Sequence, residues 1–357
     1  MQSISALLLA AAALRGISAF PQAEVASSIS YGGCPPFHGN FTIHQYQLYP
    51  ENAYFDTQSC LLYMGCLWNA TVGIYNPYTA KIVDILEFPG TTRNPLFHIG
   101  GVGVDQQSGL VSIVVDASDA FDTGGQDISG TNYIMQWNPY TQELLYKINL
   151  TETTHGLYGG YQDVEQDPEG NVYVVGTYPS SILKVSKDGK TVTPWFVPTP
   201  PIVTTTAGLA GLAAQDYILL GNDCASGNLW RFDMCSSTGI PVTVPITPPY
   251  KIGSKGVCDG IRLPLKYSGT VLLVAEDLSG VSVFRSKDAS WESAEYLGLV
   301  PWNDPSIFVT ATVQIGNSLY MVLEPFGDAI VPGQTSGNRT DFPFFDITKQ
   351  VEALVTA

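Results

Sequence analysis

The chain has 357 residues, of which 45% are hydrophobic and only 13% are charged, so it can bury a sizeable core and lacks the composition of a disordered protein. The 16 Lys and Arg residues are outnumbered by 32 Asp and Glu residues, and the net charge is -16. A chain this acidic is repelled by phosphate backbones and anionic lipid surfaces, which argues against a nucleic-acid partner.

Residues 1–19 are predicted to be a secretory signal peptide, and residues 20–357 are predicted to form a single domain. An apolar run over residues 6–14 precedes the small residues around Ser18, which is the layout of a cleaved signal. A membrane helix needs about 20 apolar residues, and Arg15 ends this run too early. We therefore expect no stable membrane insertion, and we expect the mature protein in the secretory-pathway lumen or outside the cell.

Glycosylation acceptors support export. Four Asn-x-Thr sequences fall in segments that are predicted to be loops or strand ends, and their asparagines are Asn40, Asn69, Asn149 and Asn338.

The cysteines also indicate an oxidising compartment, because their number is even and their spacing matches no zinc motif. The six are Cys34, Cys60, Cys66, Cys224, Cys235 and Cys258. We expect the N-terminal three and the C-terminal three to pair mostly within their own groups. Three cysteines cannot pair completely, so either one disulfide crosses between the groups or two thiols stay free.

A strand, turn, strand unit recurs six times along the chain, for example at residues 74–79 and 136–141. The units follow one another at intervals of roughly 50 to 60 residues, the length of one four-stranded propeller blade with its loops. The sequence therefore predicts an all-β fold, a six-bladed β-propeller with four-stranded blades. The predicted blades cover residues 55–90, 97–150, 159–198, 206–249, 256–301 and 308–350.

The last predicted blade lacks a clear fourth strand. Either residues 41–48 supply it and close the ring near the N-terminus, or the tail at residues 352–355 does; the first choice would also cover an exposed edge. Two loops, at residues 117–131 and 325–341, are unusually long, and loops of that length are often functional or disordered.

No nucleophile elbow, zinc-protease motif, phosphate loop or dinucleotide fingerprint occurs in the sequence. We therefore look for a site at the mouth of the channel, where inner strands begin and second strands end. The candidate catalytic residues there are His98, Tyr161, Gln162 and Asp259. The candidate substrate-binding residues are Trp68, Asp116, Asn222, Glu276, Thr310 and Glu324.

Each candidate also has a simpler interpretation. His98 could be an ordinary hydrogen-bonded loop residue, and the aromatic residues could serve packing alone. The acidic set Asp116, Asn222, Glu276, Asp277 and Glu324 could line a calcium or magnesium site, or it could simply satisfy loop amides. We assign no metal and no cofactor to the site.

Three stretches carry a further signal: CLWNATVGIYNP at residues 66–77, ILEFPG at 85–90 and FHIGGV at 97–102. They resemble secreted fungal propellers that are encoded in terpenoid biosynthetic clusters. This family includes the accessory propeller of the trichothecene cluster and the hetero-Diels–Alderases of tropolone sesquiterpenoid pathways.

The resemblance implies a pericyclase that joins a tropolone ortho-quinone methide to the alkene of a humulene-type sesquiterpene. Both partners would be apolar small molecules, and the reaction needs no nucleophile, metal or redox cofactor. Hydrogen bonds from His98, Tyr161 or Gln162 would then stabilise charge on the heterodiene oxygen. Two alternatives stay open: a metal-dependent lactonase-like hydrolase, and a non-catalytic secreted protein that binds a terpenoid.

Overall fold

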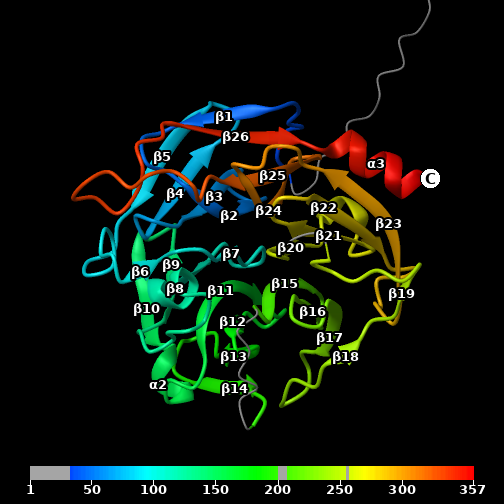
Figure 1. Cartoon of the computed structure of the whole chain (residues 1–357), viewed down its shortest axis with the longest axis horizontal. Helices are drawn as coiled ribbons and strands as arrows, with labels where there is room; N and C mark the ends of the chain where they lie inside the picture. The colour runs from blue at the N-terminus through cyan, green and yellow to red at the C-terminus, as the bar shows by residue number, and fades with distance from the viewer. Residues whose placement is uncertain (1–32, 200–206, 255–256) are drawn as a thin grey trace, which may run out of the picture.

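Six β-sheets surround a central channel in the computed structural model, which describes residues 33–199, 207–254 and 257–357 (Figure 1). The predicted six-bladed β-propeller is confirmed. The predicted signal peptide, residues 1–19, lies outside the described residues.

The first three blades follow one another along the chain, and in each the innermost strand comes first. Blade 1 holds β2 (Pro50–Asp56), β3 (Leu61–Cys66), β4 (Thr71–Asn76) and β5 (Lys81–Leu86). Blade 2 holds β6 (Phe97–His98) and β7 (Val102–Val104), which both pair with β8 (Val111–Ala117), and then β9 (Tyr133–Asn138) and β10 (Glu143–Asn149). Blade 3 holds β11 (Gly159–Gln166), β12 (Val172–Tyr178), β13 (Ser181–Val185) and β14 (Val192–Phe196).

The last three blades complete the ring. Blade 4 holds β15 (Leu209–Gln215), β16 (Ile218–Asp223), β17 (Asn228–Asp233) and β18 (Val242–Thr243). Blade 5 holds β20 (Ile261–Arg262), β21 (Val271–Glu276), β22 (Gly280–Arg285) and β23 (Ala294–Pro301), with β19 (Ile246–Thr247) parallel to β23 at the outer edge. Blade 6 holds β24 (Phe308–Ile315), β25 (Ser318–Glu324), β26 (Asp341–Asp346) and β1 (Phe41–His44).

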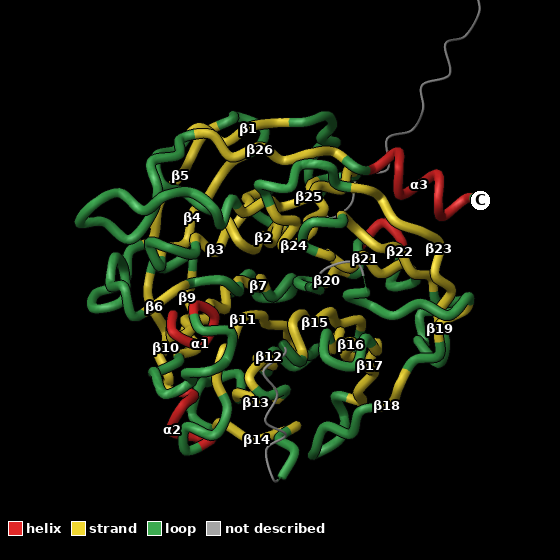
Figure 2. Tube along the Cα trace, in the orientation of Figure 1, coloured by secondary structure: helices red, strands yellow, loops and turns green. Residues whose placement is uncertain are grey.

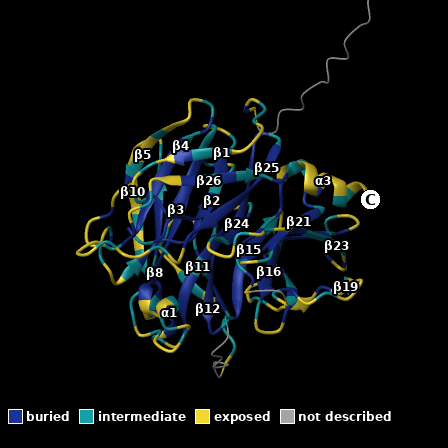
Figure 3. Cartoon of the chain, turned by 45° about the horizontal axis from the view of Figure 1, so that its top comes forward, coloured by how far each residue is buried: buried dark blue, intermediate teal, exposed yellow. Residues whose placement is uncertain are grey.

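The hydrophobic core lies between neighbouring blades. Val72 of blade 1, for example, is in the same buried cluster as Ile113 and Met135 of blade 2. Strands near the channel are buried, whereas the outer strands β5 and β10 are largely exposed (Figure 3). The inner strands are packed between neighbouring blades, which exclude water from both of their faces. The outer strands lie at the rim of the ring, where side chains reach solvent.

The repeated Asn-Pro-Tyr-Thr turns are structural. The side chain of Asn76 accepts hydrogen bonds from the backbone N–H groups of Tyr78 and Thr79, and Asn138 caps the equivalent turn of blade 2 in the same way. Asn side chains favour such turns because they satisfy backbone groups that the strands leave unpaired.

The N-terminal strand closes the ring. β1 pairs antiparallel with β26, and the rings of Phe41 and Phe344 stack with their centroids 4.8 Å apart. The alternative closure by residues 352–355 is wrong, because these residues belong to helix α3 (Thr348–Thr356), whose Val351 is buried against blades 5 and 6.

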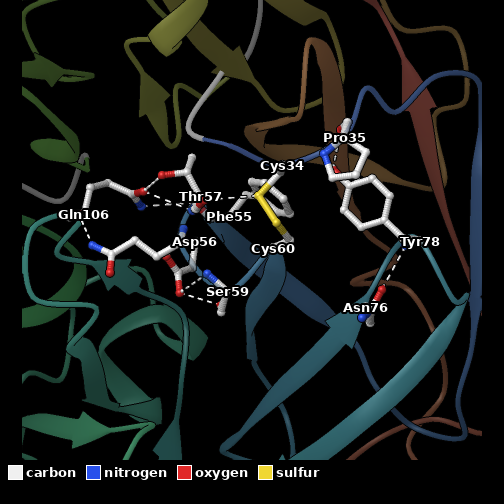
Figure 4. The surroundings of a disulfide bond; sticks show 11 residues. Cys34, Pro35, Phe55, Asp56, Thr57, Ser59, Cys60, Asn76, Tyr78 and Gln106 are labelled. Atoms are coloured by element: carbon white, nitrogen blue, oxygen red, sulfur yellow. Dashed lines mark hydrogen bonds between the residues drawn. A yellow bond between two sulfur atoms is a disulfide. The ribbon is translucent and has the colours of Figure 1, made fainter. Parts of the chain in front are cut away.

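Two disulfides tie neighbouring segments together. Cys34, just before β1, is bonded to Cys60 in the first turn of blade 1, so this bond fastens the closing segment to the next blade (Figure 4). The second bond joins Cys224 to Cys258. Both bonds lie within the predicted groups, and Cys66 and Cys235 are free, as the second of the two predicted outcomes requires.

Two details differ from the prediction. Blade 1 begins at Pro50 rather than at residue 55, and the 117–131 loop contains a short helix, α1 (Ser118–Asp122). A second short helix, α2 (Leu150–Thr154), follows β10 and is capped by Asn149 (Figure 2). None of the helices in the described ranges is long and apolar enough to cross a membrane.

Candidate functional site

A cavity of about 260 Å³ lies at the end of the channel where the inner strands begin. Five of the ten predicted site residues line it: Trp68, His98, Asp116, Gln162 and Asp259. The other lining residues are Glu51, Leu67, Gly100, Phe121, Asp122 and Phe326.

The propeller topology explains this convergence. Glu51, His98 and Gln162 lie at or near the starts of β2, β6 and β11, and Asp259 precedes β20. Trp68 follows β3, the second strand of its blade. Since all blades point the same way, these positions meet at one mouth although they are far apart in sequence.

Aromatic side chains form one part of the wall. The Trp68 indole donates a hydrogen bond from Nε1 to Glu324 Oε1 at 2.8 Å, which fixes the plane of its ring. Its ring meets His98 edge-on with centroids 5.0 Å apart, and it meets Phe326 edge-on at 6.2 Å. This arrangement offers a rigid apolar surface to a bound molecule.

The polar part of the wall carries hydrogen-bonding atoms without partners. His98 Nδ1 lies 3.8 Å from Asp116 Oδ2, too far for a direct hydrogen bond. Both atoms are buried and neither has a hydrogen-bond partner among the described residues; the same holds for Glu51 Oε2. Buried polar atoms are rarely left unsatisfied, so these three atoms are suited to bind a polar group of a ligand.

Burial also disfavours charge on this wall. It lowers the pKa of His98 to about 4, so the imidazole is neutral at pH 7. It raises the pKa of Asp116 and Asp259 well above the ordinary value, and that of Glu51 likewise, where Asp259 adds a repulsive charge. Burial therefore disfavours the charged forms of these groups and favours their uncharged, hydrogen-bonding forms.

Two predicted residues support the wall from behind. Glu324 holds Trp68, and burial raises the pKa of this carboxyl to about 8. Thr310 Oγ1 donates a hydrogen bond of 2.5 Å to the backbone carbonyl of Glu51, so blade 6 fixes the start of β2.

The remaining three predicted residues do not line the cavity. Asn222 accepts from the Gly211 N–H and donates to the Asp259 carbonyl, both at 2.7 Å. Glu276 accepts hydrogen bonds from the hydroxyl groups of Tyr250 and Ser282 inside blade 5.

Tyr161 is fully buried in the core between blades 2 and 3, together with Val114, Val164 and Leu183. The side chains along a strand alternate in direction. A register shift lies between Tyr161 and Asp163, so alternation is not strict here; Tyr161 packs in the core, and its neighbour Gln162 lines the cavity.

Sequence reasoning missed Glu51, Phe121, Asp122 and Phe326. Glu51 lies before the predicted start of blade 1. The other three belong to the two long loops, whose length was the available signal. Loop length alone did not indicate which side chains point inward.

The acidic set proposed as a metal site does not converge. Its members Asn222, Glu276 and Glu324 each bind protein groups in different blades. Among the residues that the structure describes, no group of three or more His, Cys, Asp or Glu side chains is arranged to hold a metal ion.

Comparison with known proteins gives consistent matches. A family model described as Mal s 1 allergenic protein-like matches residues 32–298. The chain is 35% identical to trichothecene biosynthesis protein 14 of Trichoderma arundinaceum, over 95% of this chain and 98% of the relative. It is 32% identical to core trichothecene cluster protein 14 of Fusarium sporotrichioides, over 91% of this chain and 89% of the relative.

A solved structure shows the same fold. The crystal structure of the major Malassezia sympodialis allergen Mala s 1 superposes with a TM-score of 0.71 and 19% identity, over 87% of this chain and 96% of the allergen.

Proposed function

The chain belongs to the Mal s 1 allergenic protein-like family of propellers, and from this premise we propose that it is a pericyclase of fungal secondary-metabolite biosynthesis. Its reaction would be a hetero-Diels–Alder addition between a tropolone ortho-quinone methide and a humulene-type sesquiterpene alkene. Two near full-length relatives are named for trichothecene biosynthesis, which supports a role in a metabolite cluster.

The proposed reaction requires no covalent bond between the protein and a reactant. One C–C bond and one C–O bond form as π bonds are consumed, and no atom, proton or electron has to be supplied. The catalyst must hold two apolar reactants in register, which removes an entropic barrier of several kcal/mol. It must also stabilise charge that develops on the heterodiene oxygen.

One observation carries the proposal: the unpartnered atoms Glu51 Oε2, His98 Nδ1 and Asp116 Oδ2 belong to a wall that also holds Trp68 and Phe326. Buried carboxyl groups with a raised pKa, beside an aromatic surface, suit an apolar reactant that carries an oxygen acceptor. The uncharged form of such a group would also help expel water from a hydroxymethyl precursor by protonating the leaving hydroxyl, while the ring hydroxyl gives up its proton as the quinone methide forms.

The test is to incubate the glycosylated protein with a quinone-methide precursor and a humulene-type alkene, with and without a chelator, and to follow the adduct by chiral chromatography. We expect faster formation of one stereoisomer, unaffected by the chelator. A product mixture equal to the protein-free control would overturn the proposal, and activity lost with the chelator would favour the lactonase-like alternative.

Replacement of His98 provides the matched variant. His98→Leu removes the unpartnered Nδ1 and should lower the adduct rate about tenfold or more, because a hydrogen bond to developing charge is lost. His44→Leu changes an exposed histidine far from the cavity and should leave the rate unchanged. Equal rates in the two variants would remove His98 from the site.

A non-catalytic binding protein remains the second candidate, because the family is named for an allergen and not for a reaction. This candidate predicts that the alkene binds to the cavity but that the product ratio does not change.

A further inference from the structure

We propose that the opposite end of the channel is a second binding site, which takes a small planar oxyanion, a carboxylate or bicarbonate, on the guanidinium group of Arg262. This site is separate from the cavity of the proposed reaction and does not depend on it.

The second cavity is built by the same inner strands that begin at the first cavity. Tyr54, Glu165 and Arg262 line it, and each lies three positions after a residue that lines the first cavity. Those earlier residues are Glu51, Gln162 and Asp259, in the same order. Its volume is about 70 Å³, which is more than one ordered water needs. It can therefore take a molecule of a few non-hydrogen atoms.

Arg262 is held in place by its neighbours, but one of its N–H groups has no hydrogen-bond partner. Its guanidinium lies over the Tyr54 ring, 4.0 Å from the centroid, and its Nη1 is 3.2 Å from Glu165 Oε1. Its Nε is buried and has no hydrogen-bond partner among the described residues. The edge that contains Nε is one of the edges through which a guanidinium binds a carboxylate with two parallel hydrogen bonds.

Two neighbouring amide side chains, Gln106 and Gln314, already donate hydrogen bonds to backbone carbonyl groups. Gln106 donates from Nε2 to the Phe55 carbonyl at 3.1 Å, and Gln314 donates to the Gly316 carbonyl at 2.7 Å. Among the described side chains that line this cavity, Arg262 Nε is the buried donor atom without a hydrogen-bond partner, and the group that it lacks is an acceptor.

Charge favours an anion over water at this position. Burial raises the pKa of Glu165 to about 8, against a smaller opposing effect of Arg262, so much of this carboxyl is protonated at neutral pH. Arg262 then keeps a positive charge in a buried place within a chain of net charge -16. A planar anion would neutralise this charge and satisfy Nε together.

The experiment is a calorimetric titration of the full glycosylated protein with sodium acetate and, separately, with sodium bicarbonate, at constant ionic strength set with sodium chloride. We expect saturable binding of one anion per chain, and the stronger of the two titrations identifies the source of the oxyanion. Absence of saturable binding by the unaltered protein for both anions would overturn the proposal, whatever the variants do.

Three variants locate the site. Arg262→Lys keeps the charge but loses the planar edge, and should weaken binding about tenfold or more. Glu165→Gln removes a carboxyl that competes for Arg262 only once it is ionised, so acetate binding should be nearly unchanged at pH 7 and tighter by a few-fold at pH 9, whereas a purely structural pair predicts no gain at either pH. Lys349→Gln, which changes an exposed cation on α3, should bind as the unaltered protein does. Equal affinity in Arg262→Lys and the unaltered protein would contradict the proposal.

Discussion

At the scale of single residues, burial reverses the usual behaviour of acidic side chains. Glu51, Asp116 and Asp259 lie on the wall of a channel cavity, where burial raises the pKa of each carboxyl well above its ordinary value. The protein is strongly acidic, yet burial disfavours charge at the site that we propose for an apolar reactant. The same burial keeps His98 neutral, so the site offers hydrogen bonds rather than ion pairs.

Burial also affects which of the glycosylation acceptors can carry a glycan. Asn69 is only 8% exposed, its Nδ2 donates to the Gln47 carbonyl, and its Oδ1 accepts from the Thr335 hydroxyl. A glycan on Nδ2 would break these contacts, so we predict that Asn69 stays unmodified. Glycopeptide mass spectrometry after enzymatic deglycosylation in H₂¹⁸O measures the occupancy of each acceptor.

Asn40 and Asn338 serve as internal controls for this measurement, since both are exposed and should be occupied. A glycan found on most copies of Asn69 would contradict the contacts that hold its amide.

At the scale of elements, the two long loops complete the cavity. The 117–131 loop contributes Phe121 through α1, and the 325–341 loop contributes Phe326. The second loop is braced where it returns to the blade: Arg339 makes two hydrogen bonds of 2.7 Å to Asp328, which also accepts from the Tyr49 hydroxyl. Each loop is therefore part of the wall.

This arrangement predicts the effect of shortening Phe326. Phe326→Ala removes an aromatic ring that packs edge-on against Trp68 and Phe308, so a bound apolar reactant loses wall contact. We expect KM for the alkene to rise about tenfold, in line with the loss of about 1–3 kcal/mol of apolar contact. Steady-state kinetics with varied alkene concentration measures this change.

Ile330→Ala is the matched control, because Ile330 is in the same loop but is exposed and does not line the cavity. A similar rise of KM in both variants would indicate a general effect of the loop rather than a contact of Phe326.

At the scale of the whole molecule, polar groups connect the blades around the channel. Asp163 of blade 3 accepts from the Asn52 amide of blade 1 and from the Leu212 N–H of blade 4. Thr310 joins blade 6 to blade 1 in the same way, through the Glu51 carbonyl. Many carboxyl groups are thereby collected in a region of low water content, which makes the stability of the fold depend on pH.

Stability should fall as the pH rises from 6.5 to 8.5. The pKa is raised to about 7 for Asp277 and to about 8 for Glu165 and Glu324, with burial the first cause in each case. In this pH range the unfolded chain has released protons that the folded chain keeps, so the free energy of unfolding decreases with pH. His98, with its pKa lowered to about 4, acts in the opposite direction, but mainly below pH 6.5.

Differential scanning calorimetry checks this prediction, and we expect Tm to fall by at least about 2 °C across the range. Glu324→Gln should flatten the dependence, since the amide does not titrate, whereas Glu292→Gln on the exposed surface should not. A Tm that rises with pH between 6.5 and 8.5 would show that these carboxyl groups are ionised in the folded protein.

The local patterns of the sequence determined the architecture. Alternating strands and capped turns such as Asn76 and Asn138 repeat with the length of a blade, and these are short-range features that six similar units share. The mouth of the channel could be predicted for the same reason: once the strand order of a blade is known, the starts of inner strands must meet. His98, Gln162 and Asp259 were identified in this way.

Tertiary structure decided the features that depend on a single side chain's direction or on a distant segment. A slip of one position along a strand exchanges the two faces. Tyr161 and Gln162 are both candidates in the sequence, and only the tertiary structure shows that Gln162 lines the cavity while Tyr161 is buried in the core. Glu51 and the loop residue Phe326 reach the wall only because the ring closes, and β1 rather than the tail closes it. The raised pKa of the wall carboxyls and the unpartnered Nε of Arg262 are likewise consequences of burial among six blades, which no local stretch of sequence contains.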